Sequence, residues 1–319
     1  MTKYLFCFLL LPFITPAQSK LSWQHVDSFY APLPKSVEVY YTDQPIDSAP
    51  FKAFYLIADL KDKKLEFNTD TTYKRRLTPQ QFYEKNEMPL LVVNGTFFSF
   101  ETNQNLNVVI KEGKAISYNT EIIRQKVGDS IREIKVYRSA IGINKKRKAD
   151  VAWISNDSSH NYVFASQVPV EQSEGIYWQS RRNGQVVKTM PSDNFYRWKM
   201  QTAIGGGPVL VQKGEIKITN NEERMFGGKA INDKHPRTAM GYTADNKLII
   251  LVVEGRNSKA GGATLIQEAQ ILKDLGCVEA INLDGGGSSC MLINGKETIS
   301  PSDKVQRPVP AVFLIKEKR

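Results

Sequence analysis

The 319-residue sequence contains few of the residues that usually bind metal ions, with only three cysteines and three histidines. No CxxC or HxxH spacing is present, which argues against a zinc site. Apart from the N-terminal stretch, no segment approaches 18 uninterrupted apolar residues, so we expect a soluble mature chain without membrane insertion. The sequence also lacks internal repeats and low-complexity tracts, and no linker divides it.

Signatures of nucleotide and nucleic-acid binding are missing as well. The glycine runs at 205–207 and 285–287 have no Gly-Lys-Ser/Thr after them and do not fit the GxGxxG pattern. The net charge of +10 favours an anionic partner, but the KKRK run at 145–148 is better explained as a solvated turn between two strands. We therefore expect no nucleic-acid partner.

The N-terminus has the three parts of a secretory signal peptide. Lys3 precedes an apolar stretch over 4–14, and Thr15-Pro16-Ala17 supplies the small-residue exit. This order predicts a signal peptide at 1–17, a mature chain that begins near Gln18, and a secreted or periplasmic location. A buried N-terminal strand is the alternative interpretation.

The cysteines set one structural question. Cys7 would leave with the signal peptide, so Cys277 and Cys290 remain in the mature chain. In an exported protein these two can form a disulfide, but both have apolar neighbours in the sequence. We favour two buried free thiols.

The remaining sequence predicts one α/β domain over 51–319, preceded by a loosely structured, proline-containing lead-in over 18–50. The segments 53–60 and 64–68 have the pattern of a hairpin, and short strands alternate with polar turns from 105 to 200. We therefore expect a single domain with a mixed β-sheet flanked by helices and a β-rich middle insertion.

The clearest pattern is a βαβ unit near the C-terminus, followed by a hairpin around Asn294-Gly295. The aliphatic run at 248–253 is typical of a buried strand, and 278–283 predicts a second one. Between them, Thr264 and Gln267 have the spacing of a capping box that opens a helix.

Each strand of this unit ends in a carboxylate followed by glycine. Because the two strands run parallel, Glu254 and Asp284 should emerge at the same edge of the sheet, where α/β folds place their ligands. Arg237 should begin the strand antiparallel to 248–253 and reach the same edge. The sequence thus predicts a site with two carboxylates and a guanidinium group.

These residues resemble the phosphodiester glycosidase family, to which the lysosomal uncovering enzyme and secreted bacterial proteins belong. The matching blocks are VNGTFF at 93–98, IGGGPVLVQKGE at 204–215, HPRTAMGYTADNKLIILVVEGR at 235–256, NLDGGGSS at 282–289 and SDKVQRPVPAVFLI at 302–315. Two positions depart from the family pattern: Thr96 stands where glycine is usual, and Glu254 where aspartate is usual.

The resemblance implies hydrolysis of a sugar-1-phosphodiester to free sugar and phosphomonoester, with a phosphorylated carbohydrate as partner. Carboxylates stabilise the positive charge that develops on the sugar, and guanidinium groups bind phosphate in a bidentate manner. We assign catalysis to Asp284, Glu254 and Arg237. The candidate substrate-binding residues are Asn94, Arg256, Gly206, Gly207, Gly285, Gly286 and Ser288.

Other interpretations remain open. Ser288 or Ser289 with His235 and Asp284 would suit a serine hydrolase, although the GxSxG elbow is absent. A non-catalytic glycan-binding protein would keep the same fold. No cofactor is expected, although Asp284 with backbone carbonyls would suit a calcium or magnesium ion.

Overall fold

The structure, a computed structural model, describes residues 20–128, 130–156, 159–170, 173–174, 179–182, 185–188 and 194–318. The predicted signal peptide at 1–17 lies outside these residues. Strands predominate over helices in the described part of the chain, and every strand pair found there is antiparallel. The expectation of a mixed sheet is therefore wrong, and the fold is mostly β with few helices.

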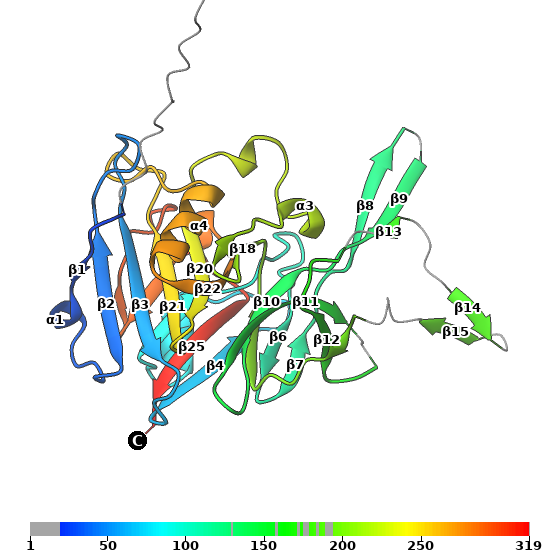
Figure 1. Cartoon of the computed structure of the whole chain (residues 1–319), viewed down its shortest axis with the longest axis horizontal. Helices are drawn as coiled ribbons and strands as arrows, with labels where there is room; N and C mark the ends of the chain where they lie inside the picture. The colour runs from blue at the N-terminus through cyan, green and yellow to red at the C-terminus, as the bar shows by residue number, and fades with distance from the viewer. Residues whose placement is uncertain are drawn as a thin grey trace, which may run out of the picture.

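Two sheets pack face to face, and each carries a helix on its outer side. Figure 1 shows α4 beside the first sheet. The first has the order β1 (Gln24–His25), β2 (Val37–Thr42), β3 (Ala53–Asp59), β21 (Lys247–Val253), β20 (Arg237–Thr243), β22 (Cys277–Asn282), β18 (Val209–Gln212) and β19 (Glu215–Ile216). The second has the order β24 (Lys296–Glu297), β23 (Met291–Ile293), β5 (Leu91–Asn94), β25 (Ala311–Glu317) and β4 (Leu65–Thr71).

Buried side chains define the four layers. Leu56 and Ile250 of the first sheet share one core with Val93 and Phe313 of the second. Helix α4 (Leu265–Asp274) packs on the outer face of the first sheet. Helix α2 (Pro79–Lys85) packs in the same way on the second sheet.

The β-rich middle of the chain is confirmed, and it forms further sheets. A seven-stranded sheet has the order β16 (Tyr196–Arg197), β12 (Val163–Ser166), β11 (Ala149–Asn156), β10 (Ser139–Ile143), β17 (Thr202–Gly205), β6 (Val109–Lys111) and β7 (Lys114–Ser117). The smaller elements are β13 (Ser173–Glu174), β9 (Ser130–Lys135), β8 (Ile122–Val127), β14 (Gln179–Arg182), β15 (Gln185–Lys188), α1 (Asp27–Tyr30), α3 (Asn220–Glu223), and the 3-10 turns Gly228–Ile231 and Gly286–Ser288. The ribbon of β8 and β9 projects from the seven-stranded sheet (Figure 1).

The predicted strand-helix-strand unit is present, but its two strands are not neighbours in the sheet. Thr264 and Gln267 form the complete capping box at the start of α4, as the sequence indicated. Strands β21 and β22 run parallel because both pair antiparallel with β20, which lies between them. The ends of β21 and β22 therefore share one edge of the sheet, separated by a strand.

Two expectations for the first third of the chain are wrong. In its described part, 20–50, the predicted lead-in is not loose, since β2 pairs with β3 along its whole length and buries Val37 and Val39. The segments 53–60 and 64–68 do not form a hairpin, because β3 and β4 belong to different sheets. The turn between them carries the chain from one layer to the next.

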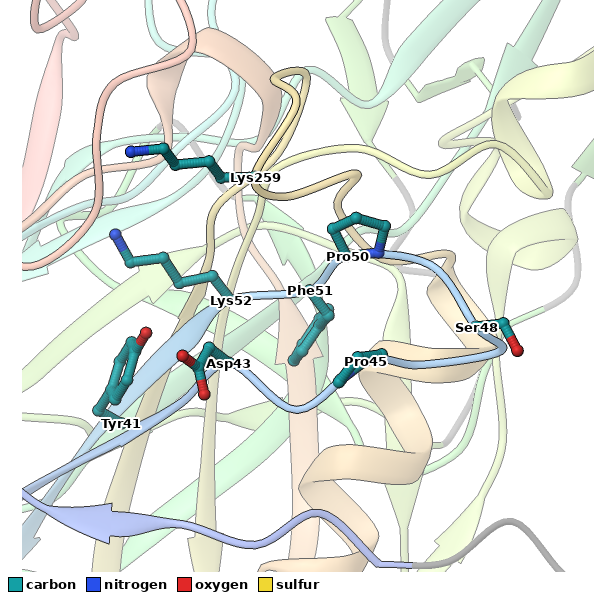
Figure 2. Close-up of a pocket in the computed structure, with 8 residues that line it drawn as sticks. All are labelled: Tyr41, Asp43, Pro45, Ser48, Pro50, Phe51, Lys52 and Lys259. Atoms are coloured by element: carbon teal, nitrogen blue, oxygen red, sulfur yellow. The ribbon is translucent and has the colours of Figure 1, made fainter.

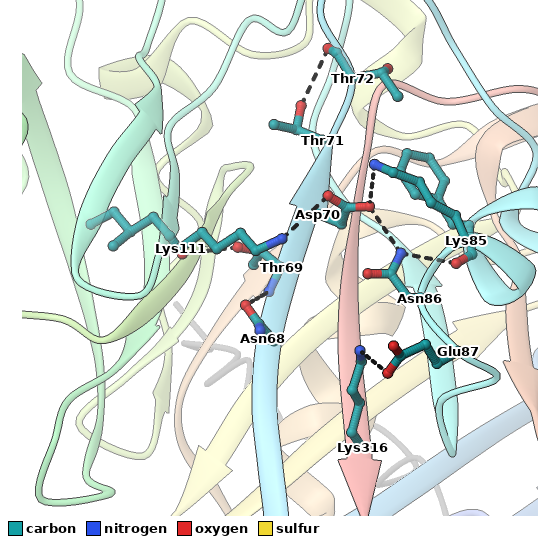
Figure 3. A network of polar contacts seen from close by, with 12 residues as sticks. Asn68, Thr69, Asp70, Thr71, Thr72, Lys85, Asn86, Glu87, Lys111 and Lys316 are labelled. Carbon is teal, nitrogen blue, oxygen red and sulfur yellow. Dashed lines mark hydrogen bonds and ion pairs between the residues drawn. The ribbon is translucent and has the colours of Figure 1, made fainter.

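A buried carboxylate joins the second sheet to its neighbours (Figure 3). Asp70 on β4 accepts hydrogen bonds from Lys85 Nζ at 2.7 Å and Asn86 Nδ2 at 2.9 Å, and Lys111 Nζ on β6 lies 3.5 Å away. Burial raises the pKa of Asp70, but the bonds from Lys85 and Asn86 and the two lysine charges outweigh burial and hold that pKa below its usual value. The contact links helix, sandwich and middle sheet.

Candidate active site

The backbone of Asp284 lies where the two sheets of the sandwich meet. Its N–H donates to the carbonyl of Gly95 at 2.9 Å, and its carbonyl accepts from Asn94 Nδ2 at 2.6 Å. The side-chain oxygen of Asn94 accepts from Thr238 Oγ1 at 2.9 Å and from the N–H of Cys290 at 3.0 Å. Asn94 is fully buried, so it holds the loop after β22 in place and exposes no surface to a ligand.

The side chain of Asp284 is crowded by protein atoms yet keeps some exposed surface. Burial raises the pKa of this carboxyl to about 7, against the hydrogen bond with Ser288, the charge of Arg307 and the N–H of Gly285, which lower it. A group with this pKa exchanges protons near neutral pH, as acid-base catalysis requires.

Arg256 lies against the glycine loop that follows Asp284. A Cβ atom built on Gly286 would lie 3.1 Å from Arg256 Nη2. The same Nη2 lies 3.3 Å from His235 Nδ1. Because guanidinium only donates, Nδ1 of His235 accepts and the neutral ring carries its proton on Nε2. Burial, followed by the charges of Arg237 and Arg256, lowers the pKa of His235.

A second guanidinium group, that of Arg307, lies against the next glycine. A Cβ atom on Gly287 would lie 2.0 Å from Arg307 Nη2, so a side chain there would require Arg307 to move. Asp303 Oδ2 orients this arginine through Nε at 2.8 Å and Nη2 at 2.7 Å, and Nη1 lies 3.5 Å from Ser288 Oγ. Sequence reasoning missed Arg307, although it stands in the matched block at 302–315.

The carboxylate of Glu254 is occupied by contacts within the protein. Oε2 lies 3.0 Å from Lys52 Nζ and accepts from the N–H of Ser300 at 2.9 Å, while Oε1 accepts from Asn257 Nδ2 at 3.1 Å. Only 2% of the residue is exposed. Glu254 is thus placed at the predicted edge but bonded away from the glycine loop.

Arg237 begins β20 as predicted, opposite Val253. Its guanidinium is buried: Nε donates to the carbonyl of Ala263 at 3.0 Å and Nη2 to that of Asp233 at 3.3 Å. Desolvation lowers its pKa, and the charge of Glu268 opposes that change. These contacts favour a structural role for Arg237, in which it positions the backbone around the site, over direct binding of a ligand.

Gly206 and Gly207 occupy positions that a larger residue cannot fill. A Cβ on Gly206 would lie 2.4 Å from the carbonyl oxygen of Asn282, and Gly207 has φ of +120°. Their N–H groups donate to the carbonyls of Ser139 at 3.0 Å and Asn282 at 2.8 Å. The two amides therefore bond the segment between β17 and β18 to β10 and β22, and they are not available to an anion.

The serine hydrolase interpretation gains no support from these contacts. The recorded partners of Ser288 Oγ are Asp284 and Arg307, whereas His235 contacts Arg256. No hydrogen bond joins Ser288 to His235 among the described residues. A serine triad requires the histidine to reach the serine hydroxyl.

Three further expectations concern the chain as a whole. Cys277 and Cys290 are buried free thiols, which confirms the favoured interpretation, and burial raises the pKa of both. Within the described ranges, no group of three or more His, Cys, Asp or Glu residues is placed to hold a metal ion. In the same part of the chain, no helix is long and apolar enough to cross a membrane.

The fold and the loop chemistry together define an antiparallel β protein in which a carboxyl with a raised pKa is followed by a glycine loop that lies against two arginines. The phosphodiester glycosidase family model matches residues 87–316. The chain therefore belongs to the phosphodiester glycosidase family.

Known proteins with similar sequences cover this chain to different extents. The N-acetylglucosamine-1-phosphodiester alpha-N-acetylglucosaminidase of Mus musculus is 31% identical over 233 residues, which is 71% of this chain and 37% of the mouse protein. The SPbeta prophage-derived uncharacterized protein YomE of Bacillus subtilis is 39% identical over 85 residues, 27% of this chain and 13% of that protein. This chain thus spans little more than a third of the mouse relative.

Among solved structures, the catalytic domain of zebrafish N-acetylglucosamine-1-phosphodiester alpha-N-acetylglucosaminidase, auto-inhibited by its pro-peptide, has a similar fold. The TM-score is 0.62 at 22% identity, with 94% of this chain and 89% of that chain covered. A hypothetical protein from Synechocystis gives a TM-score of 0.59 at 15% identity, covering 94% and 68%. At these identities the likeness establishes the fold alone.

Proposed function

We propose that this protein is a secreted or periplasmic hydrolase that cleaves the glycosidic bond of a sugar-1-phosphodiester. The products are free sugar and a phosphomonoester. The observation that carries the proposal is the loop Asp284 to Ser288, in which a carboxyl with a pKa of about 7 is followed by glycines that lie against the guanidinium groups of Arg256 and Arg307. Membership of the phosphodiester glycosidase family supports the same reaction.

The proposed roles follow from charge. Cleavage moves the bonding electrons of the C1–O bond onto the phosphate, whose charge becomes more negative, and leaves positive charge at C1. Arg256 and Arg307 stabilise the phosphate, and the carboxylate of Asp284 stabilises C1 and finally holds the proton released by the attacking water. The water oxygen bonds to C1, so atoms and charge balance.

The other predicted residues take supporting roles in this proposal. Asn94 fixes the backbone of Asp284 through the 2.6 Å bond to its carbonyl. Arg237 and Glu254 remain candidates for catalysis, but the contacts they make within the protein favour positioning. Gly285 and Gly286 allow the loop to lie close to Pro236 and Arg256, since a Cβ on Gly285 would lie 2.8 Å from the Pro236 carbonyl oxygen.

A panel of sugar-1-phosphodiesters, with products identified by mass, tests the proposal. We expect free sugar and an intact phosphomonoester from wild type. The Asp284→Asn variant should release sugar at least a hundredfold more slowly while it still binds substrate, because charge at that centre acts mainly in the transition state. A wild-type protein that binds these glycans without releasing sugar is instead a glycan-binding protein.

A further inference from the structure

A recess of about 400 Å³ opens next to the connection between β2 and β3 (Figure 2). Its lining includes Tyr41 at the end of β2, Asp43, Phe51 and Lys52, together with Lys259 from the loop before α4. All the lining residues except Lys259 lie between 41 and 52, outside the part matched by the family model, 87–316. The recess therefore lies mainly outside the part of the chain that the family model matches.

The recess and the candidate active site are connected through one loop. This loop begins at Glu254, contributes Arg256 to the glycine loop and contributes Lys259 to the recess three residues later. Lys52, which also lines the recess, lies 3.0 Å from Glu254 Oε2. The contacts that occupy Glu254 thus position a lysine of the recess.

The polar groups of the recess include both donors and acceptors. Figure 2 places the ammonium groups of Lys52 and Lys259 and the hydroxyl of Tyr41 on the same side of the recess. Asp43 supplies a carboxylate, and among the described residues no ion pair involves Lys259. The carboxylate of Asp43 lies in the wall of the recess, and the carboxylate of Glu254 neutralises the charge of Lys52. A strongly anionic ligand would meet this negative charge at close range.

A sugar ring complements such a wall. Its hydroxyls donate to carboxylate and accept from ammonium, while its C–H face packs on apolar surface such as the exposed rings of Pro45 and Pro50, which also line the recess. The ring of Tyr41 is held by Phe54, with ring centroids 4.8 Å apart, so the wall is formed before a ligand arrives. The volume falls in the usual range of small-molecule sites, about 300 to 1,000 Å³.

We propose that this recess is a subsite for a neutral sugar ring of an extended glycan substrate. The inference rests on the proposed function, since an extended substrate is what brings a second sugar beside the cleavage loop. Binding in the recess does not itself require cleavage. The two ideas can therefore be tested separately.

The first test is calorimetric titration of the full mature chain with neutral disaccharides, and with inorganic phosphate and glucose 1-phosphate as anionic probes. We expect a neutral disaccharide to bind. In the double variant Asp43→Asn/Lys259→Ala its affinity should fall at least tenfold. Both residues are exposed, so the core is left intact. Lys145→Ala, an exposed lysine in the turn between β10 and β11, is the matched control and should bind as wild type does.

The second test compares kcat/KM for a sugar-1-phosphodiester and for the same compound extended by one neutral sugar on either side of the phosphodiester. An extended compound should be the better substrate in wild type, and the double variant should lose that advantage while it cleaves the short compound normally. Binding of neutral disaccharides without cleavage of any diester keeps the subsite and overturns the proposed function. Cleavage with no gain from extension and no disaccharide binding, or binding of anionic probes alone in the recess, overturns the subsite.

Discussion

The rate of sugar release should follow the ionisation of Asp284. Burial raises the pKa of this carboxyl from the ordinary value of 3.8 to about 7. If the carboxylate is the active form, its fraction rises from about one in a hundred at pH 5 to about nine in ten at pH 8, so kcat/KM should increase roughly ninetyfold. An ordinary aspartate is more than about 90% ionised at pH 5 and would give a nearly flat profile.

The assay is kcat/KM from pH 5 to 8, with folding checked at each pH. Two other groups titrate nearby, since the pKa of His235 is lowered from 6.5 and burial raises the pKa of Glu268 to about 8. Arg307→Gln should move the midpoint to higher pH, because the charge of Arg307 lowers the pKa of Asp284, and Arg307→Lys should restore it. A flat profile, or a midpoint that disappears in His235→Gln, would refute the assignment.

Three further outcomes are expected. Arg256→Lys keeps the charge but loses bidentate binding, so kcat/KM should fall roughly ten- to a hundredfold; unchanged kinetics would assign Arg256 to structure. The raised pKa of Glu268 contributes stability that is complete below pH 4.5 and is lost as the pH rises to about 8. Because glutamine does not ionise, the free energy of unfolding of Glu268→Gln should exceed that of wild type by several kcal/mol at pH 8 and by little at pH 4.5. The same difference in unfolding free energy at both pH values would contradict this. Glu254→Gln should destabilise the fold by about 1 to 3 kcal/mol through Lys52 and reduce kcat/KM less than tenfold, whereas a hundredfold loss in a folded variant would show direct catalysis.

Local signals in the sequence predicted local structure well. Thr264 and Gln267 start α4 because their side chains satisfy backbone N–H groups within one turn. Asn294 and Gly295, with φ of 49° and 76°, form the expected turn between β23 and β24. Asp284 follows β22 for the same reason: an aliphatic run forms a buried strand, and glycines end it.

Contacts between distant segments were not predictable in the same way. Lys52 and Glu254 are 202 positions apart, and no pattern in the sequence pairs them. The order of strands that places β20 between β21 and β22 depends on packing across the whole sheet. Arg307 contacts the glycine loop from the segment before β25. Because it does not follow the end of a strand, the strand-end pattern does not predict its position. In the lead-in, the alternation that buries Val37 and Val39 covers only a few residues and stands among prolines, which are typical of loops.

The origin of the oxygen atom in the products tests the central claim most directly. A sugar-1-phosphodiester is hydrolysed in water enriched in ¹⁸O, and the mass of each product is measured. Attack of water at C1 predicts ¹⁸O in the released sugar and an unlabelled phosphomonoester. Label in the phosphate, with sugar-1-phosphate as product, would mean cleavage of the P–O bond and would contradict the roles proposed for Asp284, Arg256 and Arg307.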